Sequence, residues 1–157
     1  MTTTHDDDRC FLNDHTWDEY FAMVQRHIAE HGQHLVCVGG QYTYTVGLSP
    51  AFGFELVVYG LAPRMAGAIL NDIGESLRAG QELEIDKPDS RFTNLPVQFK
   101  RCTEQAQEIN GIARAYFGGD VPMVQIVLCD RAGKFPDDAG FDHVHMRAQP
   151  ALYRAAH

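Results

Sequence analysis

The segment at residues 41–61, QYTYTVGLSPAFGFELVVYGL, holds two strand-forming runs with a tight loop between them. Residues 42–46 alternate tyrosine with threonine, and residues 54–59 are apolar and β-favouring except at Glu55. The residues between the runs include glycine, serine and proline, which is typical of a turn. Pro63 then suits the first turn of a helix. The segment therefore predicts a β-sheet with a helix packed on it.

Hydrophobic periodicity predicts the remaining helices and strands. Thr16 and Glu19 form a T-x-x-E capping box before a helix that Gly32 ends. The predicted helices cover residues 16–31, 63–79 and 109–117. The predicted strands cover residues 35–38, 42–46, 54–59, 96–102 and 123–128.

These elements predict an α+β fold, with three helices packed on a mixed, mostly antiparallel sheet of about five strands. The chain has 157 residues, which suits one domain with a single core. We expect residues 15–157 to form that domain. Residues 1–14 carry little to bury and are expected to be a flexible N-terminal tail.

The charge and the apolar runs exclude several kinds of partner. Asp and Glu total 21 against 13 Lys and Arg, a formal net charge of -8, which disfavours nucleic acid and anionic membrane surfaces. No apolar run approaches the roughly 18 residues of a membrane span. The four cysteines form no CxxC pair and are typical of reduced core thiols. We therefore expect a cytoplasmic protein without a cofactor.

A series of short motifs resembles a bacterial family catalogued as domain of unknown function 4262. The first motifs are Tyr44, Thr45, Gly47 and Leu48, then Glu55, Leu56, Gly60 and Leu61, then Leu70, Asn71 and Asp72. The later ones are Tyr116, Gly118, Val124, Gln125, Asp130, Gly133, Phe135 and Pro136, with a closing Gln149 and Pro150. The resemblance covers roughly residues 10–153 and implies no particular chemistry, because the family's function is unassigned.

Glu55 begins an otherwise apolar strand, so its carboxylate needs hydrogen bonds or an ion pair. It is a candidate general base or ligand anchor beside Tyr44, Thr45 and Ser49. The alternative is that Glu55 ties the loop at residues 49–53 through backbone N–H groups.

Three further polar residues are ligand-binding candidates. Gln125 interrupts a buried strand, where an amide either satisfies a neighbouring backbone or points into a pocket. Asp130 either binds a ligand or forms a turn. Gln149 is the third candidate, because it belongs to the closing Gln-Pro motif of the resemblance.

His143 and His145 have the alternate spacing that places two imidazoles on one face of a strand, which makes them weak metal candidates. A solvated histidine pair is the simpler interpretation, and we expect no metal site. Cys10, with His15 five residues later, is a candidate reactive thiol.

The sequence leaves two functional hypotheses. The first is a non-catalytic domain that binds a protein or small-molecule partner through loops near Glu55 and Asp130. The alternative is a small hydrolase- or transferase-like enzyme with Glu55 as base and Tyr44, Gln125 and Asp130 as substrate-positioning groups, which requires these groups to meet in one pocket. The aromatic residues also give area for a possible homo-oligomer.

Overall fold

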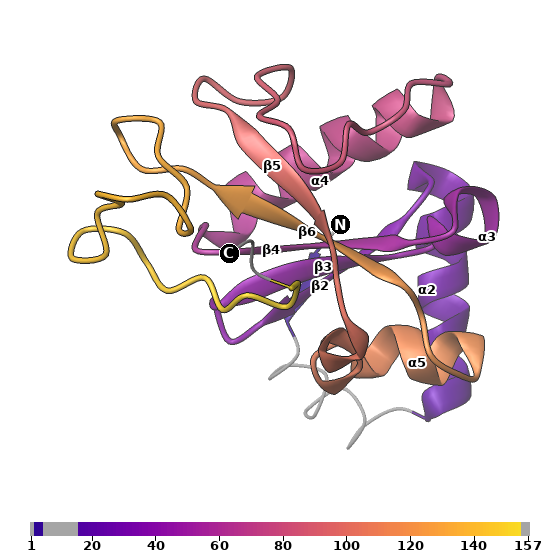
Figure 1. Ribbon diagram of the computed structural model, residues 1–157. Coiled ribbons are helices and arrows are strands. Elements are labelled where there is room, and N and C mark those ends of the chain that lie inside the picture. The colour runs from indigo at the N-terminus through magenta and orange to yellow at the C-terminus, as the bar shows by residue number, and fades with distance from the viewer. Residues whose placement is uncertain (1, 5–15, 155–157) are drawn as a thin grey trace.

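The structure is a computed structural model that describes residues 2–4 and 16–154 (Figure 1). Its core is a mixed six-stranded sheet with the strand order β1-β2-β3-β4-β6-β5. The strands are β1 (Thr2–Thr4), β2 (His34–Val38), β3 (Tyr42–Val46), β4 (Glu55–Tyr59), β5 (Val97–Arg101) and β6 (Met123–Leu128). Every predicted strand is present, and β5 lies at an edge of the sheet as its alternating pattern suggests.

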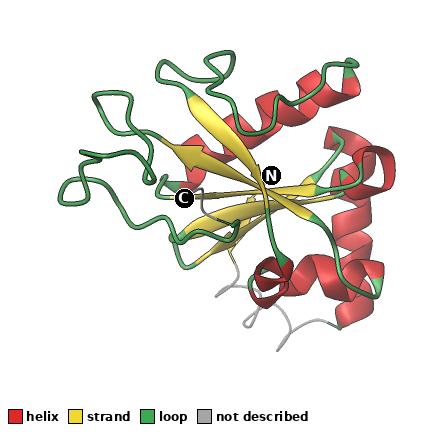
Figure 2. Cartoon of the chain, in the orientation of Figure 1, coloured by secondary structure: helices red, strands yellow, loops and turns green. Residues whose placement is uncertain are grey.

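Helices cover both faces of the sheet (Figures 1 and 2). The helical elements are α2 (Trp17–His31), α3 (Ser49–Phe52), α4 (Pro63–Arg78), the 3-10 turn η1 (Glu104–Glu108) and α5 (Gly111–Phe117). The apolar stripe of α4 packs on one face, against residues such as Leu56 and Ile126. Helices α2 and α5 pack on the other, against residues such as Tyr44 and Val57. The predicted α+β class is confirmed.

The first helix begins and ends where its capping signals predict. The backbone N–H of Glu19 donates to the hydroxyl of Thr16 at 3.2 Å, and Gly32 closes the helix with a positive φ of 87°. Tyr20 and Val24 on its inner face are fully buried. A local sequence signal is therefore enough to define this element.

The sheet is mostly antiparallel, as predicted, with two parallel pairs, β1 with β2 and β4 with β6. Strands β2, β3 and β4 pair antiparallel in chain order. Strand β6 then inserts between β4 and β5, parallel to β4 and antiparallel to β5. The carboxyl ends of β4 and β6 consequently lie side by side, and the loops that follow them gather at one end of the sheet (Figure 2).

Three local features differ from the sequence predictions or add to them. The loop expected between β3 and β4 contains the single helical turn α3, and η1 precedes the third helix. Thr2–Thr4, expected within the tail, pair in parallel with β2. Residues 5–14 of that tail lie outside the described part of the chain, so the expectation stays a prediction for them.

Within residues 2–4 and 16–154, none of the helices combines the length and hydrophobicity that a transmembrane span requires. The cysteines of the described residues, Cys37, Cys102 and Cys129, are free thiols. The two candidates Cys10 and His15 lie outside the described residues.

Candidate functional site

Glu55 is fully buried and holds the loop between β3 and β4. Its Oε1 accepts hydrogen bonds from the Thr45 hydroxyl (2.8 Å) and the Leu48 N–H (3.0 Å). Its Oε2 accepts from the Gly47 N–H (3.1 Å) and the Ser49 N–H (2.7 Å). Both carboxylate oxygens are thus used to close the loop through backbone N–H groups, as the alternative for Glu55 expects, but the donors are residues 47–49 and not 49–53 as a whole.

Two opposing effects act on the pKa of Glu55. Burial raises the pKa above the ordinary glutamate value, because the charged form loses its hydration. The hydrogen bonds from Ser49, Leu48 and Thr45 lower it, because they stabilise the carboxylate. The Thr45 hydroxyl also accepts from the Leu56 N–H at 2.9 Å, so its own hydrogen is directed at Glu55.

Gln125 and Tyr44 stand on the same face of the sheet, in register with Val57 between them. The fully buried amide of Gln125 donates to the carbonyl of Pro150 (2.9 Å) and accepts from the N–H of Leu152 (2.9 Å). The Tyr44 hydroxyl accepts from the N–H of Ile112 at 3.0 Å, at the start of α5. Each of these side chains thus holds a different segment of backbone against the sheet.

Asp130 is buried just after the last residue of β6, at the end of the sheet opposite Glu55, and shapes the loop that follows. Its carboxylate accepts from the N–H groups of Ala132 and Lys134, each at 2.9 Å, and of Asp142 at 3.0 Å. These hydrogen bonds, that from Lys134 foremost, lower the pKa of Asp130. Asp130 is therefore an ionised loop-former.

Glu55 and Asp130 do not meet. Glu55 pairs with Met123 at the start of β6, whereas Asp130 follows the end of that strand. Extended chain rises about 3.3 Å per residue, which puts roughly 16 Å along β6 alone between the two ends. Figure 1 shows α3 beside the Glu55 end and the loops after β6 at the opposite end. The pocket that the enzyme hypothesis requires, with Glu55 and Asp130 together, is not formed.

The geometry instead reveals a groove at the carboxyl ends of the parallel pair β4 and β6. The groove has a volume of about 580 Å³. It lies among Gly60 after β4, Leu128 and Cys129 at the end of β6, helix α4 and the loop before β5. Its apolar walls include Leu61, Met65, Ile69, Phe92, Leu95 and Leu128. Crevices at the carboxyl ends of parallel strands are preferred ligand sites in sheet proteins.

The polar side chains of the groove are few. Thr93, Asn94, His145 and Arg147 line it beside the apolar walls. Burial raises the pKa of the Cys129 thiol, which favours its protonated, less nucleophilic form. The groove thus resembles a binding surface more than a nucleophilic centre.

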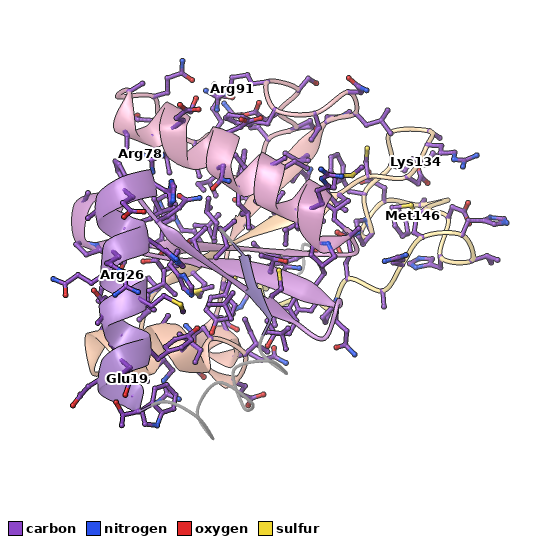
Figure 3. The ribbon with its side chains drawn as sticks, turned by 180° about the vertical axis from the view of Figure 1, so that it is seen from behind. Glu19, Arg26, Arg78, Arg91, Lys134 and Met146 are labelled. Carbon is purple, nitrogen blue, oxygen red and sulfur yellow. The ribbon has the colours of Figure 1, made fainter. Side chains whose placement is uncertain are left out.

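A segment that we call the strap, residues 147–153, starts at this end of the sheet and runs back along β6 toward its first residue, where Tyr153 forms a bridge with Cys102. The side-chain amide of Gln149 holds it against the end of β6 through the backbone of Leu128. A second cavity of about 690 Å³ lies between the strap and the β2–β3 turn, lined by Gln41, Tyr59 and Gln149 among others. Gly60 and Arg147 line both cavities, which therefore adjoin. Met146 precedes the strap and lies, like Lys134, on the loops at this end (Figure 3).

His143 and His145 do not alternate on a strand. They lie in a turn that Asp142 organises by accepting from the N–H groups of Val144 (3.2 Å) and His145 (3.0 Å). The His145 ring is 2.9 Å from the Asp142 carboxylate, and the His143 ring packs on Phe141. In the part of the chain that the structure describes, no group of three or more His, Cys, Asp or Glu is arranged to hold a metal ion.

The comparison with protein families settles the resemblance. A family model matches residues 27–142. The chain belongs to the family described as Domain of unknown function (DUF4262). No curated protein and no solved structure gives a significant match.

The DUF4262 match ends before the strap begins. It contains β4, α4 and β6, which build most of the groove, whereas Arg147 and Gln149 follow it. Sequence reasoning on this DUF4262 domain missed Met65, Leu95 and Arg147 as site residues. Met65 is an apolar residue that stays exposed near the start of α4. Only the parallel pairing of β4 with β6 shows that it lies beside the end of β6 and so lines a groove.

Proposed function

We propose that this chain is a cytoplasmic binding domain whose groove at the ends of β4 and β6 receives the apolar part of a small molecule. The observation that carries the proposal is a groove of about 580 Å³ with mainly apolar walls. This volume falls in the range of small-molecule sites. The free thiols of Cys37, Cys102 and Cys129 support a reducing compartment.

Two exposed side chains strengthen the case. Met65 is 58% exposed and Leu95 is 43% exposed, and both line the groove. Covering them with an apolar ligand removes apolar surface from water, which yields about 25 cal/mol per Å².

Asp130 does not line the groove but supports a loop next to it. The Asp130 carboxylate fixes the loop at 131–142, which leads to the groove residues His145 and Arg147. Glu55 lies at the opposite end of the sheet and has no part in the proposed binding. The enzyme hypothesis has no comparable support, since its base and Asp130 are separated.

The experiment measures binding of the neutral dye Nile red and its displacement by 1-octanol. We expect the unaltered protein to bind the dye, and Met65→Glu and Leu95→Glu to weaken binding at least tenfold, because each places a charge against apolar ligand atoms. Val144→Glu is the matched control, since Val144 is 85% exposed and does not line the groove. Absence of dye binding, or equal binding by all four proteins, would disprove the proposal.

A further inference from the structure

Arg147 lies where the groove and the second cavity adjoin. It lies close to Gly60, the residue that follows β4. A Cβ atom built on Gly60 would lie 3.6 Å from the Cβ of Arg147 and 3.8 Å from the Cγ of Gln149. The strap therefore passes within contact distance of the end of β4, and the Cβ atom of Arg147 lies next to Gly60.

The backbone that carries Arg147 is held on its C-terminal side. Gln149 makes two hydrogen bonds with the backbone of Leu128, at 2.7 and 3.1 Å. Gln125 makes two more with the backbone of Pro150 and Leu152, each at 2.9 Å. The backbone next to Arg147 is therefore ordered before binding, so a ligand that docks here does not have to order this segment.

The guanidinium of Arg147 has no hydrogen bond or ion pair within residues 2–4 and 16–154. Other arginines of the same chain do have acidic partners, Arg91 with Asp89 and Arg114 with Asp120. The carboxylate of Asp142, in the turn that precedes Arg147, lies at 2.9 Å from the ring of His145. Arg147 thus keeps its donors available for a ligand.

The charge around Arg147 contrasts with that of the whole protein. The chain has a formal net charge of -8, yet no Asp or Glu is among the described residues that line either cavity. A guanidinium and the amide of Asn94 therefore face the groove without a competing carboxylate. Arginine forms paired, charge-assisted hydrogen bonds with a carboxylate, and these are among the strongest polar contacts in proteins.

We infer that the ligand of the groove is an amphipathic carboxylate, whose charged head pairs with Arg147 and whose apolar chain lies between Met65 and Leu95. This inference rests on the proposed function, because it assigns the head group of a molecule whose apolar part occupies the groove. A fatty-acid-like molecule meets both requirements, and a neutral alcohol of equal length meets only one.

Octanoate and 1-octanol, which share an alkyl chain and differ in the head group, separate the two proposals. Isothermal titration at pH 7 is expected to show octanoate binding at least tenfold more tightly than octanol. Arg147→Gln is expected to remove this preference by weakening octanoate at least tenfold while changing octanol less than twofold. Arg64→Gln is the control, because it removes the same charge from an exposed site on α4 that lines neither cavity.

Each result has a definite meaning. Equal affinity for the two compounds, or a preference that survives in Arg147→Gln, overturns the assignment of the carboxylate but leaves the groove as an apolar site. Binding of neither compound overturns both proposals. A loss of octanoate binding in Arg64→Gln equal to that in Arg147→Gln would show that only net charge matters, which also overturns the role of Arg147.

Discussion

The side-chain amide of Gln149 pairs with the backbone of Leu128 as a neighbouring strand would. Its Oε1 accepts from the Leu128 N–H at 2.7 Å, and its Nε2 donates to the Leu128 carbonyl at 3.1 Å. One side chain thus satisfies both backbone groups at the last residue of β6, beside the groove. The strap that carries Arg147 depends on this contact.

Gln149→Ala is expected to lower the free energy of unfolding by about 1–3 kcal/mol, because the Leu128 N–H and carbonyl lose their partners. Hydrogen exchange of the Leu128 amide should become faster than in the unaltered protein. Gln105→Ala serves as the control, since the Gln105 side chain is exposed on η1. Unchanged exchange at Leu128 would contradict the pairing.

Glu55→Gln is expected to destabilise the protein by roughly 2–4 kcal/mol, because the new amide group would point a donor at backbone N–H donors. Urea denaturation measures the effect. The exposed Glu75 on α4 provides the matched control Glu75→Gln, which should change stability by less than about 0.5 kcal/mol. If Glu55→Gln and Glu75→Gln are equally stable, the four hydrogen bonds to Glu55 contribute little to the free energy of unfolding.

Gly47 and Gly111 are expected to respond to alanine in opposite directions. Gly47 has φ +127°, and a Cβ there would lie 2.8 Å from Cγ1 of Ile28. Gly47→Ala should therefore destabilise by about 1–3 kcal/mol. Gly111 opens α5 with nothing within 4 Å of its Cβ position, so Gly111→Ala should stabilise by about 0.4–1 kcal/mol. Thermal denaturation compares them, and a shift of the same sign in both variants would refute this explanation.

The buried histidines His27 and His34 predict a dependence of stability on pH. Their Nδ1 atoms are 2.8 Å apart, and the Tyr20 hydroxyl lies 3.3 Å from Nε2 of His34. Burial lowers the pKa of His34 to about 3, and burial also lowers the pKa of His27. Unfolding restores a pKa near 6.5, so the unfolded chain binds more protons between these values. The free energy of unfolding should fall as the pH drops below 6.5, by about 1.4 kcal/mol per pH unit for His34.

Urea denaturation at pH 7 and pH 5 tests this dependence. His34→Gln should be less stable at pH 7 but should lose less stability between the two pH values than the unaltered protein. His31→Gln changes a half-exposed histidine on α2, the helix that carries His27, and should keep the original dependence. An identical loss of stability in all three proteins would assign the effect to other groups.

The loop around Glu55 shows how far local reasoning reaches into the candidate site. A carboxylate at the start of an apolar strand requires donors, and the sequence suggested that the adjoining loop supplies them. The structure adds which groups do so, namely Thr45 and the N–H groups of residues 47–49. The sequence did not indicate that Asp130 lies at the far end of the sheet, because that separation depends on how β6 pairs with β4.

What the sequence determined by itself is local: the capped first helix, the strands on either side of the Gly39 turn, and the class of the fold. Such features depend on contacts between residues near in the chain, so periodicity and capping signals reveal them. Only the tertiary structure decided the groove. It forms because β6, more than sixty residues after β4, inserts between β4 and β5. That choice depends on packing and backbone pairing between distant segments, which also bring Arg147 over Gly60, and no local pattern encodes it.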